Sequence, residues 1–249
     1  MQTVIIGSGN VAYHLAKALA AIKLPPVQIF GRNEKELQLI SDELKIPYST
    51  KKIVDSDIYL ICVSDHAVED VSKIIGKKDC LVAHTSGSLP MEALKGEYRK
   101  ASFYPLQTFS RSKVLDYSKI PFFIEAESDE DRKILFSLAS EISENVMEST
   151  YEKRKYIHLT AVFACNFVNH LFSRAKEISD SQEIPFDYFL PLIDETVQKI
   201  HEIEPKTAQT GPAVRNDRRI LELHEQLLKS ESLEIYKTMN HSIQKMYEL

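Results

Sequence analysis

The feature that most constrains this chain is a glycine-containing turn near its amino terminus. Residues 7–12 have the sequence Gly-Ser-Gly-Asn-Val-Ala, which fits the pattern G-x-G-x-x-A. An apolar run, Val4–Ile6, precedes the turn, and a segment rich in Ala and Leu, Val11–Ala21, follows it. This order predicts a strand, a tight turn and a helix. The first glycine permits the turn, the second lets a ligand approach the backbone, and the alanine lets the helix pack closely on the strand.

Such a turn can bind a diphosphate, because the unpaired N–H groups at the start of a helix point toward the anion. We therefore expect a dinucleotide. The residues predicted to hold its phosphates are Gly7, Ser8, Gly9, Asn10 and Val11. Two alternatives are a turn that binds no ligand and a turn that binds another nucleotide-like molecule such as S-adenosylmethionine. The strand before the turn and the helix after it favour the dinucleotide.

The end of the second predicted strand, Val27–Phe30, indicates which dinucleotide is bound. Proteins that bind NAD usually carry an acidic residue here, about 20 residues beyond the glycines. This chain instead has Gly31, followed by Arg32 and Asn33. A glycine does not repel a phosphate, and a guanidinium can donate two hydrogen bonds to it. We expect NADP(H), with Arg32 and Asn33 among the cofactor-binding residues. The alternative is a solvated surface arginine beside a turn glycine.

Short apolar runs alternate with amphipathic helical segments through the first 150 residues. The predicted strands are Val4–Ile6, Val27–Phe30, Ile58–Val63, Cys80–Ala83, Ala101–Tyr104 and Phe122–Ile124. Helices are predicted at Val11–Ala21, Glu34–Leu44 and Val68–Ile75, and Ser128 is the expected N-cap of another. Ile58–Val63 is apolar throughout, as expected of a central strand in a parallel sheet covered on both faces. The alternation predicts the α/β class, with a doubly wound parallel Rossmann sheet.

After residue 150 the pattern contains no strand-like run. Tyr151–Ser179 is predicted as one long helix whose middle, Leu159–Phe172, is apolar on nearly all sides. Such a helix must be buried in a bundle or a subunit interface. Further helices are expected at 187–203, 215–228 and 233–247. We therefore predict a nucleotide-binding domain at 1–150, followed by an all-α C-terminal domain at 151–249.

Composition excludes several classes of protein. Lys and Arg total 31 against 36 for Asp and Glu, a formal charge of −5, so the chain lacks the basic character of a nucleic-acid-binding protein. Its three cysteines form no C-x-x-C pair, which predicts neither a disulfide framework nor a zinc site and indicates a cytoplasmic protein. No apolar run reaches 18 residues, so we expect no membrane helix. No H-E-x-x-H or carboxylate loop occurs, so no metal is predicted.

Two further loops follow predicted strands, and ligands of open α/β sheets bind at the carboxyl ends of the strands. The residues expected to line the nicotinamide side of the site are Val63, Ser64, Thr85 and Ser86. Helix capping is the alternative, above all for Ser64. His66 and His84 belong to the same loops. For both histidines a hydrogen-bonded structural role is the alternative to a functional one.

Four separated motifs occur in order along the chain: Gly7–Ala12, His84–Ser88, Phe103–Phe109 and Thr210–Asp217. Together they resemble an uncharacterised family of NADP oxidoreductases that pairs a Rossmann domain with a C-terminal helical domain of unknown function. The resemblance covers essentially the whole chain. More distantly, the architecture is similar to pyrroline-5-carboxylate reductase, 6-phosphogluconate dehydrogenase and the β-hydroxyacid dehydrogenases. This resemblance implies a homodimer that forms through the helical domain.

The resemblance also implies residues that contact the substrate. His158 and Asn166 would face the cleft as catalytic residues, since a spacing of eight places them on broadly the same side of a helix. Histidine is a common general acid, and an asparagine can polarise a carbonyl group. Tyr104, Arg215 and Asp217 are the expected substrate contacts, with an arginine suited to a carboxylate. The alternatives are a core histidine, a buried amide and a salt-bridged turn.

The chain departs from the β-hydroxyacid dehydrogenases on its long helix. Those enzymes use a Lys and an Asn four residues apart, whereas Val162 stands four residues before Asn166 in this chain. Their chemistry therefore does not transfer directly. We predict an NADP-dependent oxidoreductase that transfers hydride between the nicotinamide and a small carbonyl or imine substrate. The alternative is a non-catalytic NADP-binding sensor or scaffold protein.

Overall fold

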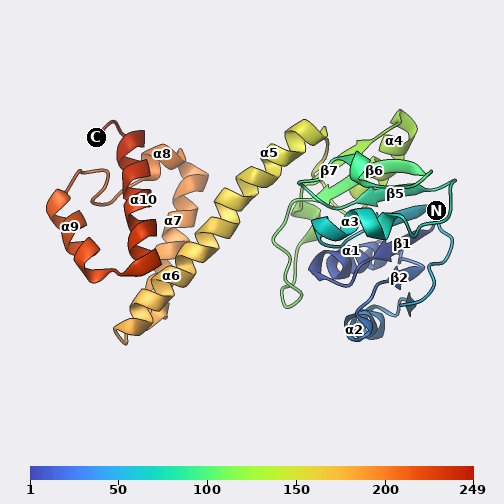
Figure 1. The fold of residues 1–249 in the computed structure, drawn as a ribbon, viewed down its shortest axis with the longest axis horizontal. Coiled ribbons are helices and arrows are strands. Elements are labelled where there is room, and N and C mark those ends of the chain that lie inside the picture. Colours follow the sequence, from blue (N-terminus) through green and yellow to red (C-terminus); the bar gives the residue numbers. More distant parts are fainter. The chain divides into compact units, whose positions relative to one another are not determined.

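The structure, a computed structural model, describes residues 1–249. The chain forms two compact units, residues 1–166 and residues 167–249 (Figure 1). The predicted domain boundary near residue 150 lies at the start of the helix that begins with Tyr151, which belongs to the first unit. The assignment of a separate role to each domain stays a prediction.

The first unit is built around an eight-stranded sheet with the strand order β3-β2-β1-β4-β5-β6-β7-β8. The strands are β1 (Thr3–Ile6), β2 (Gln28–Phe30), β3 (Tyr48–Ser49), β4 (Ile58–Ile61), β5 (Leu81–His84), β6 (Arg99–Pro105), β7 (Phe122–Ala126) and β8 (Val146–Glu148). The first six are parallel, whereas β7 runs antiparallel to β6 and parallel to β8. The predicted doubly wound Rossmann sheet is confirmed, and its last two strands make one edge mixed.

Helices cover both faces of this sheet (Figure 1). They are α1 (Asn10–Ala21), α2 (Glu34–Leu44), α3 (Asp65–Ser72) and α4 (Asp129–Ser140), with short 3-10 helices at Met91–Ala93 and Tyr117–Lys119. The next helix, α5 (Tyr151–Ala161), contributes no side chain to the apolar cluster on either face. α1, α2 and α4 contribute to the apolar cluster on one face, which includes Ile5 and Leu60. On the other face, Val68 of α3 belongs to the cluster that contains Val4 and Tyr59. Alternate residues of β1 and β4 therefore enter opposite cores, as expected of central strands.

Local sequence signals set several helix ends. α2 has the predicted bounds: Asn33 Oδ1 accepts a hydrogen bond from the N–H of Glu36 at 3.3 Å, and Lys45 ends the helix in the left-handed conformation. Ser128 Oγ likewise accepts from the N–H of Asp131 at 3.1 Å, as the capping pattern predicts. The predicted start of α3 is wrong by about one turn, because the apolar pattern marks only the buried face whereas the helix already begins at Asp65.

The order of the strands reverses beside β1, since β2 and β4 lie on its two sides. The chain leaves these neighbouring strands toward opposite faces of the sheet, so the loops at their carboxyl ends separate and open a crevice. The turn at residues 7–9 follows β1, and residues 62–64 follow β4. The fold therefore brings the glycine turn and the Val63-Ser64 loop to the two sides of one opening.

The predicted long helix is present but not regular. α5 continues through a π-helical stretch, Val162–Phe167, into α6 (Val168–Ser181). π-helical turns are uncommon and occur frequently at functional sites. Within one chain the apolar side chains of this region are not buried: Leu159 is 48% exposed and Phe163 is 62% exposed.

The second unit consists of helices. They are α6, a 3-10 helix at Phe186–Phe189, α7 (Leu190–Glu202), α8 (Pro205–Ala208), α9 (Arg218–Leu227) and α10 (Ser230–Met246). Pro191 stands in the first turn of α7, where its missing N–H costs no hydrogen bond. Ala213 and Leu221 are the only apolar side chains of this unit that are buried. No helix of the protein has both the length and the apolar character needed to cross a membrane.

Candidate functional site

The conformation and packing of the protein require a glycine at position 7. Its φ of +137° lies in a region that side-chain-bearing residues rarely adopt, and a Cβ atom would lie 2.2 Å from the carbonyl oxygen of Cys62. Its N–H donates to the carbonyl of Phe30 at 2.7 Å, which joins the end of β1 to the end of β2. The first glycine of the motif therefore makes the tight turn from β1 into α1, as the sequence predicts.

Gly9 has a different reason to be glycine. Its φ of −82° suits any residue, and a Cβ placed on it would meet no protein atom within 4 Å. Neither backbone conformation nor packing therefore requires a glycine. Gly9 lines both of the cavities that open at this edge of the sheet, so a side chain here would occupy that space. A ligand that approaches the backbone closely explains the glycine.

The start of α1 presents unpaired donors beside Gly9. The N–H groups of Gly9, Asn10 and Val11 donate to no protein acceptor, and the first helical hydrogen bond runs from the N–H of Tyr13 to the carbonyl of Gly9. The Asn10 side chain is already engaged, because its Nδ2 donates to the carbonyl of Phe109 at 2.9 Å. The backbone, rather than the side chain of Asn10, is therefore available to an anion.

The larger cavity, of about 940 Å³, lies between the ends of β1 and β2 and the first turns of α3. Backbone from the glycine turn and apolar side chains such as Phe30, Val71 and Ile74 line it. Ser8 and Val63, two of the predicted cofactor contacts, contribute to the same wall, and their role as contacts stays a prediction. An apolar slot that ends on backbone N–H groups suits a flat ring joined to a phosphate.

Arg32 stands at the rim of this larger cavity. Its exposed side chain forms no ion pair and no hydrogen bond within the protein. Gly31 is buried, and a Cβ there would make only ordinary contact, 3.5 Å from Leu37, so the protein does not exclude a larger residue on steric grounds. Asn33 also lines the cavity while it caps α2. The region thus holds a free cation and no carboxylate on the end of β2.

The second cavity, of about 440 Å³, adjoins the first, and the two share Gly9, Cys62, Val63 and Ser64. Thr85 and Ser86 line it from the end of β5. Thr85 Oγ1 donates to the carbonyl of Ile61 at 3.2 Å, and Ser86 Oγ accepts the N–H groups of Ser88 and Leu89 at 3.0 and 3.2 Å. These hydroxyls shape the loop from within while they border the cavity. The Ser64 side chain does not cap α3.

Tyr104 and His158 meet at the far wall of the second cavity. The Tyr104 hydroxyl lies 3.0 Å from His158 Nδ1, although β6 and α5 are far apart in the sequence. A Cβ on Gly87 would lie 2.7 Å from the Tyr104 ring and 2.8 Å from the His158 Cβ. Gly87 is therefore the residue that lets the two side chains reach each other. This pair offers a hydroxyl and an imidazole to any molecule in the cavity.

The surroundings of Tyr104 keep its hydroxyl protonated. Burial raises the pKa of Tyr104 to about 12, although the positive charge of Arg154 opposes this effect. Arg154 is itself completely buried, where it pairs with Glu125 and donates from Nη2 to the carbonyl of Leu89 at 2.6 Å. A phenol with a raised pKa remains a hydrogen-bond donor across the physiological pH range.

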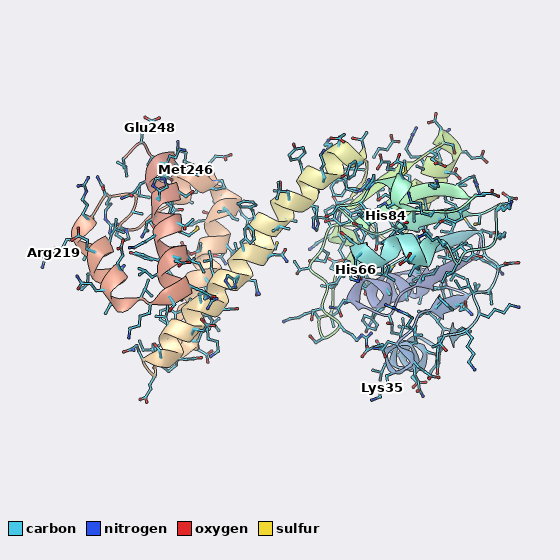
Figure 2. All side chains as sticks on the ribbon, viewed as in Figure 1. Lys35, His66, His84, Arg219, Met246 and Glu248 are labelled. Atoms are coloured by element: carbon cyan, nitrogen blue, oxygen red, sulfur yellow. The ribbon has the colours of Figure 1, made fainter.

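The two loop histidines differ in their surroundings. Figure 2 shows His66 on α3 and His84 at the end of β5. His84 is fully buried, its Nδ1 accepts the N–H of Ser86 at 3.2 Å, and burial lowers its pKa to about 3. His84 therefore accepts a hydrogen bond within its own loop and lines neither cavity. His66 lines the larger cavity, and its Nε2 lies 3.3 Å from Ser64 Oγ. No group of three or more His, Cys, Asp or Glu side chains is arranged to hold a metal ion.

Of the remaining predicted residues, Asn166 lies in the first unit and lines neither cavity, whereas Arg215 and Asp217 belong to the second unit. Asn166 belongs to the π-helical stretch and has an exposed side chain. Asp217, in the second unit, caps α9 by accepting the N–H of Ile220 at 3.3 Å. Arg215 is exposed and forms no ion pair with Asp217, so the salt-bridged turn considered from the sequence does not form.

Sequence reasoning missed three contributors: Gly87, Arg111 and Arg154. Arg111 reaches the glycine turn from the loop after β6, and its Nη2 donates to the carbonyl of Ser8 at 3.2 Å. No spacing pattern links residues so far apart, because only the tertiary fold brings them together. The motif Phe103–Phe109 leads directly into this loop and gave the available signal.

Comparison with known proteins agrees with this geometry. Residues 2–84 match the family described as NADP oxidoreductase, coenzyme F420-dependent, and residues 120–243 match a domain of unknown function, DUF2520. A solved structure described as a "putative NADP oxidoreductase" from Bacteroides fragilis is 38% identical, with a TM-score of 0.93 over 98% of each chain. The chain belongs to this family of NADP oxidoreductases. The predicted resemblance is thus confirmed, and the protein is an oxidoreductase.

Two more distant structures share the fold alone. A reductive aminase from Aspergillus terreus, solved with NADPH and ethyl-5-oxohexanoate, is 13% identical, with a TM-score of 0.70 over 98% of this chain and 94% of that one. A pyrroline-5-carboxylate reductase from Streptococcus pyogenes is 16% identical, with a TM-score of 0.62 over 100% and 99%. No curated protein matches the chain.

Proposed function

We propose that this NADP oxidoreductase uses NADP(H) to reduce a small carbonyl or imine substrate. The observation that carries the proposal is the joined pair of cavities at the point where the strand order reverses. One cavity has an unpaired arginine at its rim, and the other has a tyrosine–histidine pair on its wall. Relatives of the same fold solved with NADPH or NADP+ support the choice of cofactor. Coenzyme F420, which the family description mentions, is the competing cofactor.

The residues around the larger cavity fit NADP(H). The free N–H groups of Gly9, Asn10 and Val11 would hold the diphosphate, which the absence of a side chain on Gly9 makes possible. Arg32 would bind the additional phosphate on the adenosine ribose, because no carboxylate occupies the position of Gly31. When bound, NADPH supplies the hydride.

The second cavity would hold the substrate beside the nicotinamide. The wall between the two cavities includes Val63 and Ser64, which line both of them. Thr85 and Ser86 line the second cavity only. In our proposal the Tyr104 hydroxyl donates a hydrogen bond to the carbonyl oxygen or imine nitrogen, because its raised pKa keeps it protonated. His158 Nδ1 lies 3.0 Å from the phenol oxygen; when Nδ1 carries the ring proton it would donate to that oxygen, which leaves the phenol hydrogen for the substrate. If Tyr104 passes this proton to the reduced heteroatom, His158 would pass its own proton to the phenolate oxygen. Donation at this heteroatom polarises the double bond.

The other predicted residues keep their proposed roles. Asn166 is proposed to polarise the substrate, and Asp217 to contact it. Arg215 is proposed to bind a substrate carboxylate, which its exposed and unpaired guanidinium supports.

We also propose that the protein is a cytoplasmic homodimer that forms through its helical region. The support is the large number of apolar side chains that one chain leaves exposed there, including Tyr188 at 72% and Leu192 at 63%. Monomeric proteins rarely expose large contiguous apolar patches. All three cysteines are free, which agrees with a reducing compartment.

Turnover against a panel of keto acids, aldehydes and cyclic imines tests the proposed reaction, with NADPH, NADH and reduced F420 as separate donors. We expect turnover with NADPH, and Tyr104→Phe should lower kcat by roughly 100-fold or more while the cofactor KM stays unchanged. Tyr48→Phe, which alters a partly buried tyrosine of β3 that lines neither cavity, is the matched control. Turnover with F420 alone, or an unchanged kcat in Tyr104→Phe, would contradict the proposal.

A further inference from the structure

The loop between β6 and the 3-10 helix at Tyr117–Lys119, residues 106–116, lies across the start of α1; we call it the strap. Asn10 Nδ2 donates to the strap carbonyl of Phe109 at 2.9 Å. One turn further along α1, His14 Nε2 lies 3.0 Å from the carbonyl of Ser110, and its Nδ1 lies 2.9 Å from the Tyr117 hydroxyl. A carbonyl only accepts, so Nε2 donates to Ser110 and Nδ1 accepts from Tyr117.

His14 is suited to hold the strap in one position. It is almost completely buried, and burial lowers its pKa, although the hydrogen bond to the carbonyl of Ser110 opposes this effect. The neutral ring has one donor and one acceptor, and both are satisfied. The strap is therefore fastened to α1 at Phe109 and Ser110, and the 3-10 helix that follows it is fastened to α1 at Tyr117.

This attachment places Arg111 against the glycine turn. Its guanidinium lies over the Tyr13 ring at 5.2 Å from the centroid, pairs through Nη1 with Glu36 of α2, and donates from Nη2 to the carbonyl of Ser8 at 3.2 Å. Its Nε is buried without an acceptor. Arg111 lines neither cavity. It is therefore engaged with the protein and is not placed to bind a ligand.

The bond to Ser8 matters because of the peptide that it fixes. In a trans peptide the C=O of one residue and the N–H of the next lie in one plane and point in opposite directions. When Arg111 holds the carbonyl of Ser8 on the strap side, the N–H of Gly9 points away from the strap. Gly9 borders both cavities and its N–H has no protein acceptor.

We infer that Arg111 is a positioning residue for anion binding: through the Ser8 carbonyl it orients the Gly9 N–H toward the cofactor diphosphate. The inference rests on the proposed function. It assigns the two arginines near the turn separable tasks. Arg32 recognises the phosphate that NADPH has and NADH lacks, whereas Arg111 acts on the diphosphate that both nucleotides carry. Loss of Arg111 should therefore weaken both nucleotides equally.

The test compares Arg111→Met with Lys113→Met, a substitution on the same strap that removes the same charge from an exposed, unpaired side chain. Calorimetry would measure NADPH, NADH and inorganic pyrophosphate. We expect Arg111→Met to weaken all three, the nucleotides by the same factor of about 10. We expect Lys113→Met to change none, and Arg111→Lys to recover part of the loss. The amide resonance of Gly9 in the free protein should move in Arg111→Met alone.

Three outcomes for the Arg111→Met variant would overturn the inference. Unchanged binding in Arg111→Met would show that the turn needs no such support, and a loss confined to NADPH would make Arg111 a ligand of the additional phosphate. An unshifted Gly9 resonance would show that the peptide keeps its orientation without the guanidinium. If the unsubstituted protein binds pyrophosphate but neither nucleotide, the proposed function fails while the role of Arg111 is still measured. If it binds none of the three, both fail.

Discussion

The first and second units of the chain contrast in how they bury apolar side chains. In residues 1–166 the central strands of the sheet are enclosed on both faces, and Ile5, Leu60 and Phe103 have no exposed surface. In residues 167–249 the helices are equally well formed, yet apolar side chains such as Leu192 and Leu227 remain 63% and 72% exposed. Helices with a regular apolar pattern can therefore form although their apolar side chains are not buried within one chain.

This contrast shows that an apolar pattern in the sequence predicts that a face of a helix or strand is buried. The pattern does not show which part of the protein, or which other chain, buries that face. The parallel sheet obtains its cover from the helices that connect its own strands, so the pattern and the partner are encoded together. The C-terminal helices have no such obligatory neighbour. A second copy of the chain is the cover that we propose, and this proposal gives the contrast a direct test.

The largest effect is expected from breaking the proposed subunit contact. Leu192→Lys places a charge on an exposed apolar position of the second unit, and Leu39→Lys does the same at a position of α2 that is 57% exposed. Each buried leucine contributes roughly 1.5–3 kcal/mol, and a symmetric dimer loses two. The dimer dissociation constant, measured by analytical ultracentrifugation, should rise roughly 100-fold or more for Leu192→Lys only. If both variants changed the dissociation constant equally, the proposal that the exposed apolar side chains of the second unit form the dimer contact would be wrong.

A slightly smaller effect is expected from the buried ion pair of the first unit. Arg154→Met leaves Glu125 without its partner, and loss of one member of a buried pair costs about 3–5 kcal/mol. Arg174→Met, which removes exposed ion pairs in the second unit, should cost at most about 1 kcal/mol. Denaturant unfolding measures both free energies. The double variant Arg154→Met with Glu125→Gln should recover stability, and failure to do so would contradict the role of the charge.

Several of these features follow from the sequence, and others do not. The glycine turn and the bounds of α2 depend on residues close in sequence, so local patterns predicted them. The strand order depends on pairing between distant segments, and the sequence predicted only a doubly wound parallel sheet. β3 and β8 contain two and three residues, too few to show a period. The hydrophobic pattern of the π-helical stretch that contains Asn166 is the same as that expected of a buried α-helix. The sequence therefore could not predict the π-helical conformation. The prediction that His158 and Asn166 lie on the same side of the helix assumed the spacing of a regular α-helix, and the π-helical stretch interrupts that spacing.

Some features of the candidate site could likewise be predicted from the sequence, and others could not. Gly7 and Gly9 could be assigned from the motif, and the structure supplies the separate physical reason for each. The contact between Tyr104 and His158 joins β6 to α5 and requires the whole fold. The same is true of the bond from Arg111 to the turn. Local sequence patterns therefore account for the two glycines of the turn, whereas the contacts between distant segments require the whole fold.

A third effect, of about 3 kcal/mol between pH 7 and pH 4, is expected from His84. Its pKa is lowered to about 3 by burial, so between that pH and about 6.5 the unfolded chain binds more protons than the folded one. Stability should therefore fall as the pH falls through this window. Denaturant unfolding of His84→Gln should show a smaller loss over the same range. The same loss in both proteins would mean that other groups cause it.

The central claim is that the crevice beside β1 binds NADP(H) and that Arg32 selects it over NAD(H). Isothermal titration of the intact protein with NADPH and NADH, repeated for Arg32→Ala, tests this claim most directly. A charge-assisted bond of about 1.5–3 kcal/mol predicts that NADPH binds roughly 10- to 150-fold more tightly than NADH, and that Arg32→Ala removes the difference. Absence of binding by either nucleotide, or an equal loss for both in Arg32→Ala, would contradict it.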